Sequence, residues 1–150
     1  MTKRSLIILG LLVVASMVLA ACGGSSYECD DPIGCVTYGP GEPVRIASAL
    51  VISGPNTDLG TDSQYGAEIA IAFRDNIMGH PIELQAEDDG CSAEGGQSAG
   101  QKITSDPTII AIVGTSCSGA GVPMSEVMSE AGFSMLSPSN TAPSLTDPDQ

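Results

Sequence analysis

The sequence predicts an α/β protein with a doubly wound, mainly parallel sheet, and three observations lead to that class. Short apolar runs alternate with stretches of helical periodicity along residues 44–136. Two of these runs are apolar at almost every position, which is typical of parallel strands buried on both faces. Polar turns rich in Gly, Ser and Thr follow several of the runs. Right-handed crossovers then favour the strand order 2-1-3-4.

Four strands are expected. The run at residues 44–52 is almost continuously apolar, as in a strand buried on both faces, and the run at 109–113 is the most apolar, so we expect it to be central. Residues 82–87 alternate between apolar and polar side chains, as in a strand nearer to a sheet edge. The fourth strand is expected at residues 133–136, after a helix that stops at Gly132.

The first helix is expected to begin at Thr61, which stands at capping-box spacing from Gln64, and to end near Asn76. Its buried face should consist of the apolar residues at positions i, i+4, i+7 and i+8. These residues are Tyr65, Ile69, Ala72 and Phe73.

The other two helices have their own start signals. Ser92 is expected to cap a helix over residues 93–104, although the glycines of that segment lower its helix propensity. Pro123 suits a first helical position, so the third helix should begin there. Its apolar stripe includes two methionines, for which core packing is a better explanation than soft-metal binding. The stripe consists of Met124, Val127, Met128 and Ala131.

The first residues follow the order of a bacterial lipoprotein signal: a basic start, an apolar stretch at residues 6–18, and the lipobox-like tetrad Leu-Ala-Ala-Cys at 19–22. We expect residues 1–21 to be a signal peptide and Cys22 to carry lipid, which would anchor the exported chain to the outer face of the cytoplasmic membrane. An ordinary secretory signal with a chance cysteine is the alternative. Residues 22–43, rich in Gly, Ser, Pro and Asp, should form a flexible linker to a domain at 44–150.

Four further cysteines fit an exported chain, because disulfides persist in oxidising compartments. Three pairings of these four are possible. Proximity in the sequence favours Cys29–Cys35 and Cys91–Cys117. A metal site is not expected, because the sequence has no Cys-x-x-Cys and its single histidine, His80, lies near none of the cysteines.

Composition argues against nucleic acid as a partner. The chain has 18 acidic and 5 basic residues, a formal net charge of −13, and only 3% aromatic residues. Phosphate binding needs clustered Lys and Arg, and base stacking needs aromatic rings. The turn after the first strand has no G-x-G-x-x-G, and no G-x-x-x-x-G-K is present, so no nucleotide cofactor is expected.

Catalysis is also not expected. Asp88 and Asp89 follow the second strand and could suggest a phosphoacceptor pocket, but capping or solvating the turn explains them better. Ser118 as a nucleophile would need a base, and His80 precedes the second strand, at the opposite end of the sheet.

Two polar turns, at residues 114–119 and 137–141, follow the third and fourth strands. In an open parallel sheet these turns lie at the carboxyl ends of strands, where such sheets bind ligands. Their Gly, Ser and Thr residues offer N–H groups and hydroxyls without charges. This chemistry suits a small carboxylate held at a helix N-terminus, although ordinary turns and caps also favour Ser and Thr.

Several of these features recur in the same order in periplasmic branched-chain amino-acid-binding proteins, and the chain resembles that family over residues 44–146. The shared features are the lipobox, residues 44–54 and 79–84, the pair Asp88-Asp89, a cysteine pair at 91 and 117, and Ser-Pro-x-x-Thr at 137–141. Members are the Leu/Ile/Val receptors of ABC importers. The resemblance implies a bilobal type I periplasmic binding fold that closes on its ligand, without catalysis or a cofactor.

The resemblance also implies site residues. Ser118, Ser139 and Thr141 match positions that bind the carboxylate and amino group of the ligand amino acid. Leu59 is nearest to a position where family members often carry an aromatic ring beside the ligand. The chain is therefore expected to capture a branched-chain or related amino acid, or an amide, for an ABC permease and ATPase. A ligand-sensing receptor without transport is the alternative.

Length is the largest departure from the family pattern. Family chains are much longer and cross to a second lobe soon after the Ser-Pro-x-x-Thr loop. This sequence stops at Gln150, so we expect it to supply an incomplete first lobe, as a truncated reading frame would.

Overall fold

The computed structural model describes residues 28–147 of a chain that forms two compact units, Met1–Gly34 and Cys35–Gln150. The predicted signal peptide and the predicted lipidation site, Cys22, lie outside the described residues. Residues 28–34 contain a turn in which the Gly34 N–H donates to the Asp31 carbonyl over 3.0 Å. Among residues 28–147, none of the helices combines the length and apolar character that crossing a membrane requires.

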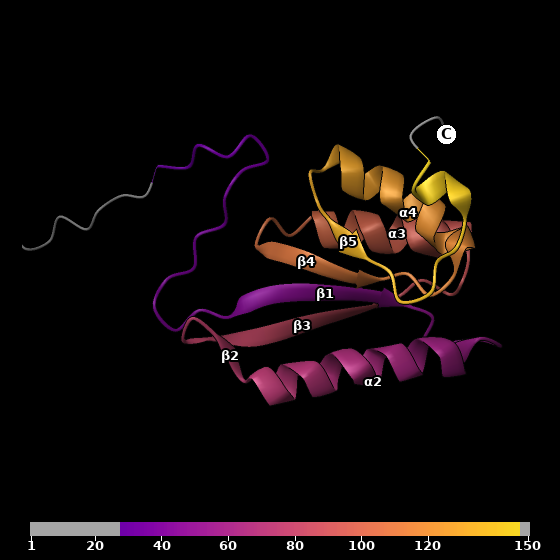
Figure 1. The fold of residues 1–150 in the computed structure, drawn as a ribbon, viewed down its shortest axis with the longest axis horizontal. Helices are drawn as coiled ribbons and strands as arrows, with labels where there is room; N and C mark the ends of the chain where they lie inside the picture. Colours follow the sequence, from indigo (N-terminus) through magenta and orange to yellow (C-terminus); the bar gives the residue numbers. More distant parts are fainter. Residues whose placement is uncertain (1–27, 148–150) are drawn as a thin grey trace, which may run out of the picture. The chain divides into compact units, whose positions relative to one another are not determined.

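A five-stranded sheet organises the second unit (Figure 1). Its strands are β1 (Val44–Leu50), β2 (Asn76–Ile77), β3 (His80–Asp88), β4 (Ile109–Gly114) and β5 (Met135–Leu136). They lie in the order β2-β3-β1-β4-β5. All pairs are parallel except β2–β3, which forms a short antiparallel hairpin. The predicted order of the four main strands is confirmed, and β2 is an addition that the sequence pattern did not indicate.

Helices cover both faces of the sheet, which confirms the doubly wound class. They are α2 (Thr57–Arg74), α3 (Ala93–Thr104) and α4 (Ser118–Glu130), followed by the short 3₁₀ helix η1 (Pro143–Leu145). Figure 1 shows α2 along one face, and α3 and α4 along the other. The strand β4 lies inside the sheet, between β1 and β5, but its α2 face is only partly covered, because Ile110 is 47% exposed.

The core lies between the sheet and the α3–α4 layer. It contains two alanines of β1, two isoleucines of β4, and side chains from both helices. The predicted core methionines, Met124 and Met128, are 0% and 1% exposed, and Phe133 packs against the cluster. The full core list is Ala47, Ala49, Ala99, Ile103, Ile109, Ile112, Met124 and Met128.

Helix α3 has the predicted bounds, and Ser92 caps it by accepting the Gly95 N–H over 3.0 Å. Its glycines serve close packing. A Cβ on Gly96 would lie 2.2 Å from the carbonyl oxygen of Ala120 in α4, so only glycine lets the two helices approach this closely. Helix α4 begins at Ser118, five residues before the predicted start, and Pro123 lies inside it.

Helix α2 differs most from expectation. It begins at Thr57 rather than Thr61, and its buried residues are Gly60 and Gln64. The side chain of Gln64 faces β1, where its Oε1 accepts from the Ser48 hydroxyl over 2.6 Å. The face predicted to be buried is exposed, with Phe73 93% exposed. A buried polar pair therefore sets the rotation of this helix against the sheet, in place of the apolar stripe.

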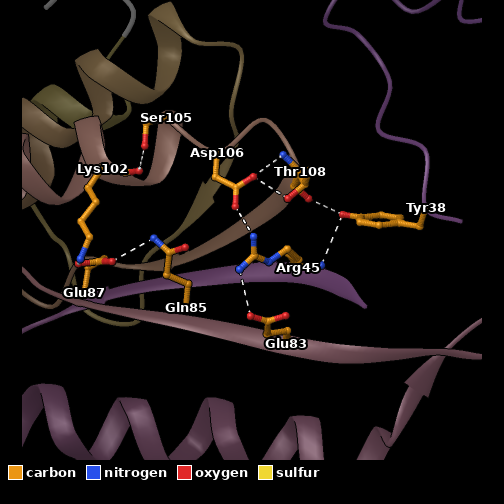
Figure 2. A network of polar contacts seen from close by, with 9 residues as sticks. All are labelled: Tyr38, Arg45, Glu83, Gln85, Glu87, Lys102, Ser105, Asp106 and Thr108. Atoms are coloured by element: carbon orange, nitrogen blue, oxygen red, sulfur yellow. Dashed lines mark hydrogen bonds and ion pairs between the residues drawn. The ribbon is translucent and has the colours of Figure 1, made fainter. Parts of the chain in front are cut away.

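A polar network lies at the end of the sheet where β1 and β4 begin (Figure 2). Arg45 forms ion pairs with Asp106 and, over 3.0 Å, with Glu83. Tyr38 donates its hydroxyl to the Thr108 carbonyl over 2.5 Å and so holds the segment before β1 against the α3–β4 loop. This network holds the strands together at the end of the sheet opposite the polar turns.

Candidate functional site

The two polar turns predicted at the carboxyl edge of the sheet lie against each other. Ser118, the first residue of α4, accepts with its Oγ the backbone N–H groups of Thr141 and Ala142, over 2.9 and 3.1 Å. Ser139 donates its hydroxyl to the Ser116 carbonyl over 2.6 Å. The structure therefore brings together the three site residues Ser118, Ser139 and Thr141, which come from segments more than twenty positions apart.

These bonds determine what each hydroxyl can still do. A serine hydroxyl has one donor hydrogen and two acceptor lone pairs. Ser118 uses both lone pairs on the loop, which leaves its hydrogen to donate to a ligand oxygen. Ser139 uses its hydrogen internally, so toward a ligand it can only accept, for example from an ammonium group.

The N-terminus of α4 adds donors at the same place. Cys117 occupies the N-cap position and makes no side-chain cap hydrogen bond, and the first turn has no acidic residue. N–H groups of a first turn carry partial positive charge and favour an anion. An uncapped helix end beside the Ser118 hydroxyl can hold a small carboxylate.

Leu59 lies in the first turn of α2, which follows β1, and its side chain is 47% exposed. The end of β1 is at the same sheet edge as the two polar turns, because β1 and β4 are parallel neighbours. Leu59 can therefore offer an apolar surface at that edge. Its role beside a ligand stays a prediction.

The disulfide Cys91–Cys117 braces this edge. Its Cα atoms are 5.2 Å apart, and it joins the loop after β3 to the residue before α4. Because β3 and β4 flank β1, the bridge ties together loops from either side of the central strand. This pairing agrees with the prediction. Cys29 and Cys35 are also disulfide-bonded cysteines, and their pairing with each other stays a prediction.

Asp88 shapes the loop after β1. Its Oδ1 accepts the N–H groups of Ile52 and Gly90 over 3.1 and 2.9 Å. Partial burial acts to raise the pKa of Asp88, but hydrogen bonds from Ser53, Gly90 and Ile52 outweigh it, so the pKa lies below its usual value. The expectation that this acid caps the turn is met.

Asp89 does not fit the expectation of a solvated turn, because its side chain is 0% exposed. Its Oδ1 accepts the Cys91 N–H over 2.8 Å, whereas its Oδ2 and the hydroxyl of buried Ser116 have no hydrogen-bond partner. Burial raises the pKa of Asp89, and the N–H groups of Cys91 and Ser116 only partly oppose this. Asp89 therefore contacts the backbone of Cys91, one of the two cysteines of the disulfide.

Two residues that the sequence reasoning did not single out hold the site together. Ser137 donates to the Thr115 carbonyl over 2.7 Å and accepts the Asn140 N–H over 2.8 Å. Asn140 donates its side-chain amide to the hydroxyl of buried Thr115 over 2.9 Å. A Ser and an Asn two to three residues apart are a common turn signal, which could have indicated their local role but not their distant partner.

The structure separates His80 from Ser118. His80 begins β3, at the opposite end from Ser118, and its Nδ1 lies 2.8 Å from the Glu42 carbonyl. Residues 28–147 contain no group of three or more His, Cys, Asp or Glu side chains arranged to hold a metal ion.

An open, doubly wound sheet with uncharged donors at its carboxyl edge defines a ligand-binding α/β domain. A family model described as periplasmic binding protein matches residues 43–150. The chain belongs to this periplasmic binding protein family.

Individual relatives agree with that assignment. The chain is 30% identical over 108 residues to the Leu/Ile/Val-binding protein of Escherichia coli (strain K12), and 35% identical over 106 residues to the Leu/Ile/Val-binding protein BraC3 of Rhizobium johnstonii. The matches cover 70% and 69% of this chain. The chain spans only 29% of the length of each of these relatives.

Solved structures show the same fold. The substrate binding protein LivJ of Streptococcus pneumoniae, in complex with isoleucine, superposes with a TM-score of 0.65 at 27% identity, covering 70% of this chain and 31% of LivJ. A substrate-binding protein from Desulfitobacterium hafniense in complex with leucine gives a TM-score of 0.62 at 28% identity, covering 71% and 32%. This chain therefore has the type I periplasmic binding fold, and it corresponds to part of one lobe.

Proposed function

We propose that this chain supplies one face of the amino-acid site of an extracytoplasmic, non-catalytic solute-binding protein that serves an ABC importer. The ligand is a branched-chain or related amino acid, or an amide, and the partners are the permease and ATPase of the importer. Relatives named for Leu/Ile/Val binding support the ligand class. The observation that carries the proposal is the Ser118 hydroxyl, whose two acceptor positions are occupied by Thr141 and Ala142.

The chemistry of this face fits one end of an amino acid. The free hydrogen of Ser118 and the uncapped α4 N-terminus donate to the carboxylate. The oxygens of Ser139 and Thr141 accept from the ammonium group. Leu59 faces the side chain of the bound amino acid. This chain supplies only one wall of such a site, which would leave much of the ligand in water, so binding by this chain alone should be weak.

Titration of the ¹⁵N-labelled chain with L-leucine tests the proposal, because NMR detects weak binding. We expect saturable shifts of the amides of residues 118–119 and 139–142, and their loss in Ser118→Ala. Leucinol, which lacks the carboxylate, should leave the α4 amides unshifted. Equal shifts with leucinol, or shifts confined to other parts of the chain, would contradict the assignment. Micromolar affinity in a calorimetric titration would contradict the expectation of weak binding.

We further propose that the chain is a lipoprotein, with residues 1–21 as its signal peptide, Cys22 as the lipidated residue and residues 22–43 as the linker to the domain at 44–150. The order of basic start, apolar stretch and lipobox supports this. Metabolic labelling with palmitate in a bacterial host should modify the wild-type chain and not Cys22→Ser. Label retained by the variant would refute the assignment.

A further inference from the structure

The outer face of α2 carries an apolar stripe that packs on nothing in the described part of the chain. Tyr65, Ile69 and Phe73 are 58%, 66% and 93% exposed. They lie at i, i+4 and i+8, so they form one continuous line on the helix. Exposed aromatic and aliphatic side chains gathered on one face mark an interaction site more often than scattered ones do.

The stripe lies on the opposite side of α2 from the face that packs on the sheet. That face consists of buried Gly60 and Gln64 and half-buried Ala67 and Ile71. At about 100° per residue, the middle of the stripe lies about 160° around the helix from this face. Figure 1 shows α2 as the outermost layer on its side of the sheet. A partner that covers the stripe must therefore approach from outside the sheet layers.

A depression of about 640 Å³ lies on the same surface, and it is lined by Gly66, Ile69, Ala70, Phe73 and Arg74. The first four stand at i, i+3, i+4 and i+7. Four residues at this spacing form the hole that accepts one bulky side chain, the knob, of a facing helix. Gly66 and Ala70 are small, so the backbone of such a helix can approach closely.

Charge indicates the chemistry of the partner. Asp58 and Asp62 are exposed and continue the line of the stripe toward the N-terminus of α2. Asp62 lies about two turns, roughly 11 Å, from the centre of the hole, and Asp58 about three turns, roughly 17 Å. A second copy of this chain, with a formal net charge of −13, would be repelled. Lysine or arginine in the partner would neutralise both aspartates.

We propose that the outer face of α2 is a docking surface for an amphipathic α-helix of another protein. The helix inserts a bulky apolar residue into the hole formed by residues 66, 69, 70 and 73. It places basic side chains about two to three turns away, against Asp62 and Asp58. This inference does not depend on the ligand site, which lies at the carboxyl edge of the sheet.

The test uses the full chain and a fluorescent synthetic helix of about 20 residues, with leucines on one face and lysines at one end. We expect saturable binding in fluorescence anisotropy, weakened as the salt concentration rises from about 0.05 M to about 0.5 M. A matched peptide with glutamate in place of lysine should bind at least about tenfold more weakly.

Variants test whether binding depends on this surface of α2 or only on the overall negative charge of the chain. Gly66→Leu fills the hole without a clash, because no atom lies within 4 Å of a Cβ at this position. Phe73→Asp places a charge in the stripe. Each should weaken binding by about tenfold or more. Leu136→Asp changes an apolar residue that is 75% exposed on β5, and it should bind as the wild type does.

Circular dichroism confirms that each variant is folded. Equal binding by wild type, Gly66→Leu and Phe73→Asp would overturn the proposal, as would equal binding of the glutamate peptide. Self-association of the wild-type chain that both α2 variants abolish would assign the face to a second copy instead, and would also overturn it.

Discussion

The side-chain amide of Asn140 donates to the hydroxyl oxygen of Thr115 over 2.9 Å, and this bond joins the two polar loops at the carboxyl edge of the sheet. Thr115 is 0% exposed and also donates to the Cys117 carbonyl over 3.0 Å. Asn140 fills the space above Gly121, where a Cβ would lie 2.2 Å from its Nδ2. The loop after β5 is therefore anchored to the loop after β4 by a bond that does not involve Ser118.

Replacing Asn140 with alanine should destabilise the domain by about 1–2 kcal/mol, because a buried hydroxyl loses one partner and a small cavity forms. Urea denaturation of wild type and variant measures this. Asn56→Ala is the control, since Asn56 is exposed and its side chain makes no cap hydrogen bond to α2. The control should change stability by less than about 0.5 kcal/mol. Equal effects of the two variants would contradict the anchoring role of Asn140.

Removing the Cys91–Cys117 disulfide should destabilise the domain by roughly 3–4 kcal/mol, because the crosslink restricts an unfolded loop of intermediate length. The two cysteines are 26 positions apart. The double variant Cys91→Ser/Cys117→Ser should unfold at lower urea concentration than wild type. The double variant Cys29→Ser/Cys35→Ser is the comparison. A disulfide between these two cysteines would close a shorter loop, so its removal should destabilise the domain less. Non-reducing peptide mapping that joined Cys91 to Cys29 or Cys35 would refute the pairing.

Gly96→Ala and Gly66→Ala should change stability in opposite directions, although both replace a glycine inside a helix. At Gly96 the new Cβ would meet the Ala120 carbonyl at 2.2 Å, so we expect a loss of about 1–3 kcal/mol. At Gly66 nothing lies within 4 Å, so the better helix propensity of alanine should stabilise by roughly 0.5–1 kcal/mol. Thermal unfolding of the pair checks this, and the same sign for both would contradict the close α3–α4 contact.

The pH dependence of stability should separate two aspartates. Burial raises the pKa of Asp89 above its ordinary value of 3.8, so its contribution to stability is present below that value and is lost as the pH rises through the folded-state pKa. Asp89→Asn should therefore gain stability relative to wild type as the pH rises above 3.8. Urea denaturation at several pH values measures this difference.

Asp106 is the matched control, because its pKa is shifted in the opposite direction. Hydrogen bonds from the hydroxyl and N–H of Thr108, and the nearby Arg45 guanidinium, hold the pKa of Asp106 below its ordinary value of 3.8. Its contribution is present above that value and is lost as the pH falls through the folded-state pKa. Asp106→Asn should therefore lose stability relative to wild type as the pH rises. Parallel pH profiles for the two variants would contradict this assignment.

Patterns that depend on nearby residues predicted much of this domain. The alternation of apolar runs and helical stretches predicted the order of the four main strands, and the right-handed crossover rule predicted their arrangement. Ser92 caps α3 as its type and position indicate, and Met124 and Met128 pack in the core. The location of the polar turns followed as well, because parallel strands place their carboxyl ends at one edge.

The tertiary structure decided which side of α2 is buried. The stripe of Tyr65, Ile69 and Phe73 has the periodicity of a core face, but the Gln64–Ser48 hydrogen bond and the close approach of Gly60 to Val51 turn α2 the other way. Periodicity shows that residues share a face and cannot show what that face contacts.

The sequence by itself therefore determined the class of fold, the core of the α3–α4 layer and the edge at which the two polar turns lie. Only the tertiary structure decided how individual polar groups are buried and hydrogen-bonded. Asp89 is fully buried, and Ser118 accepts hydrogen bonds from the backbone of residues 141 and 142. These outcomes depend on partners more than twenty positions away, and hydrogen bonds need distances of about 3 Å that no local pattern encodes.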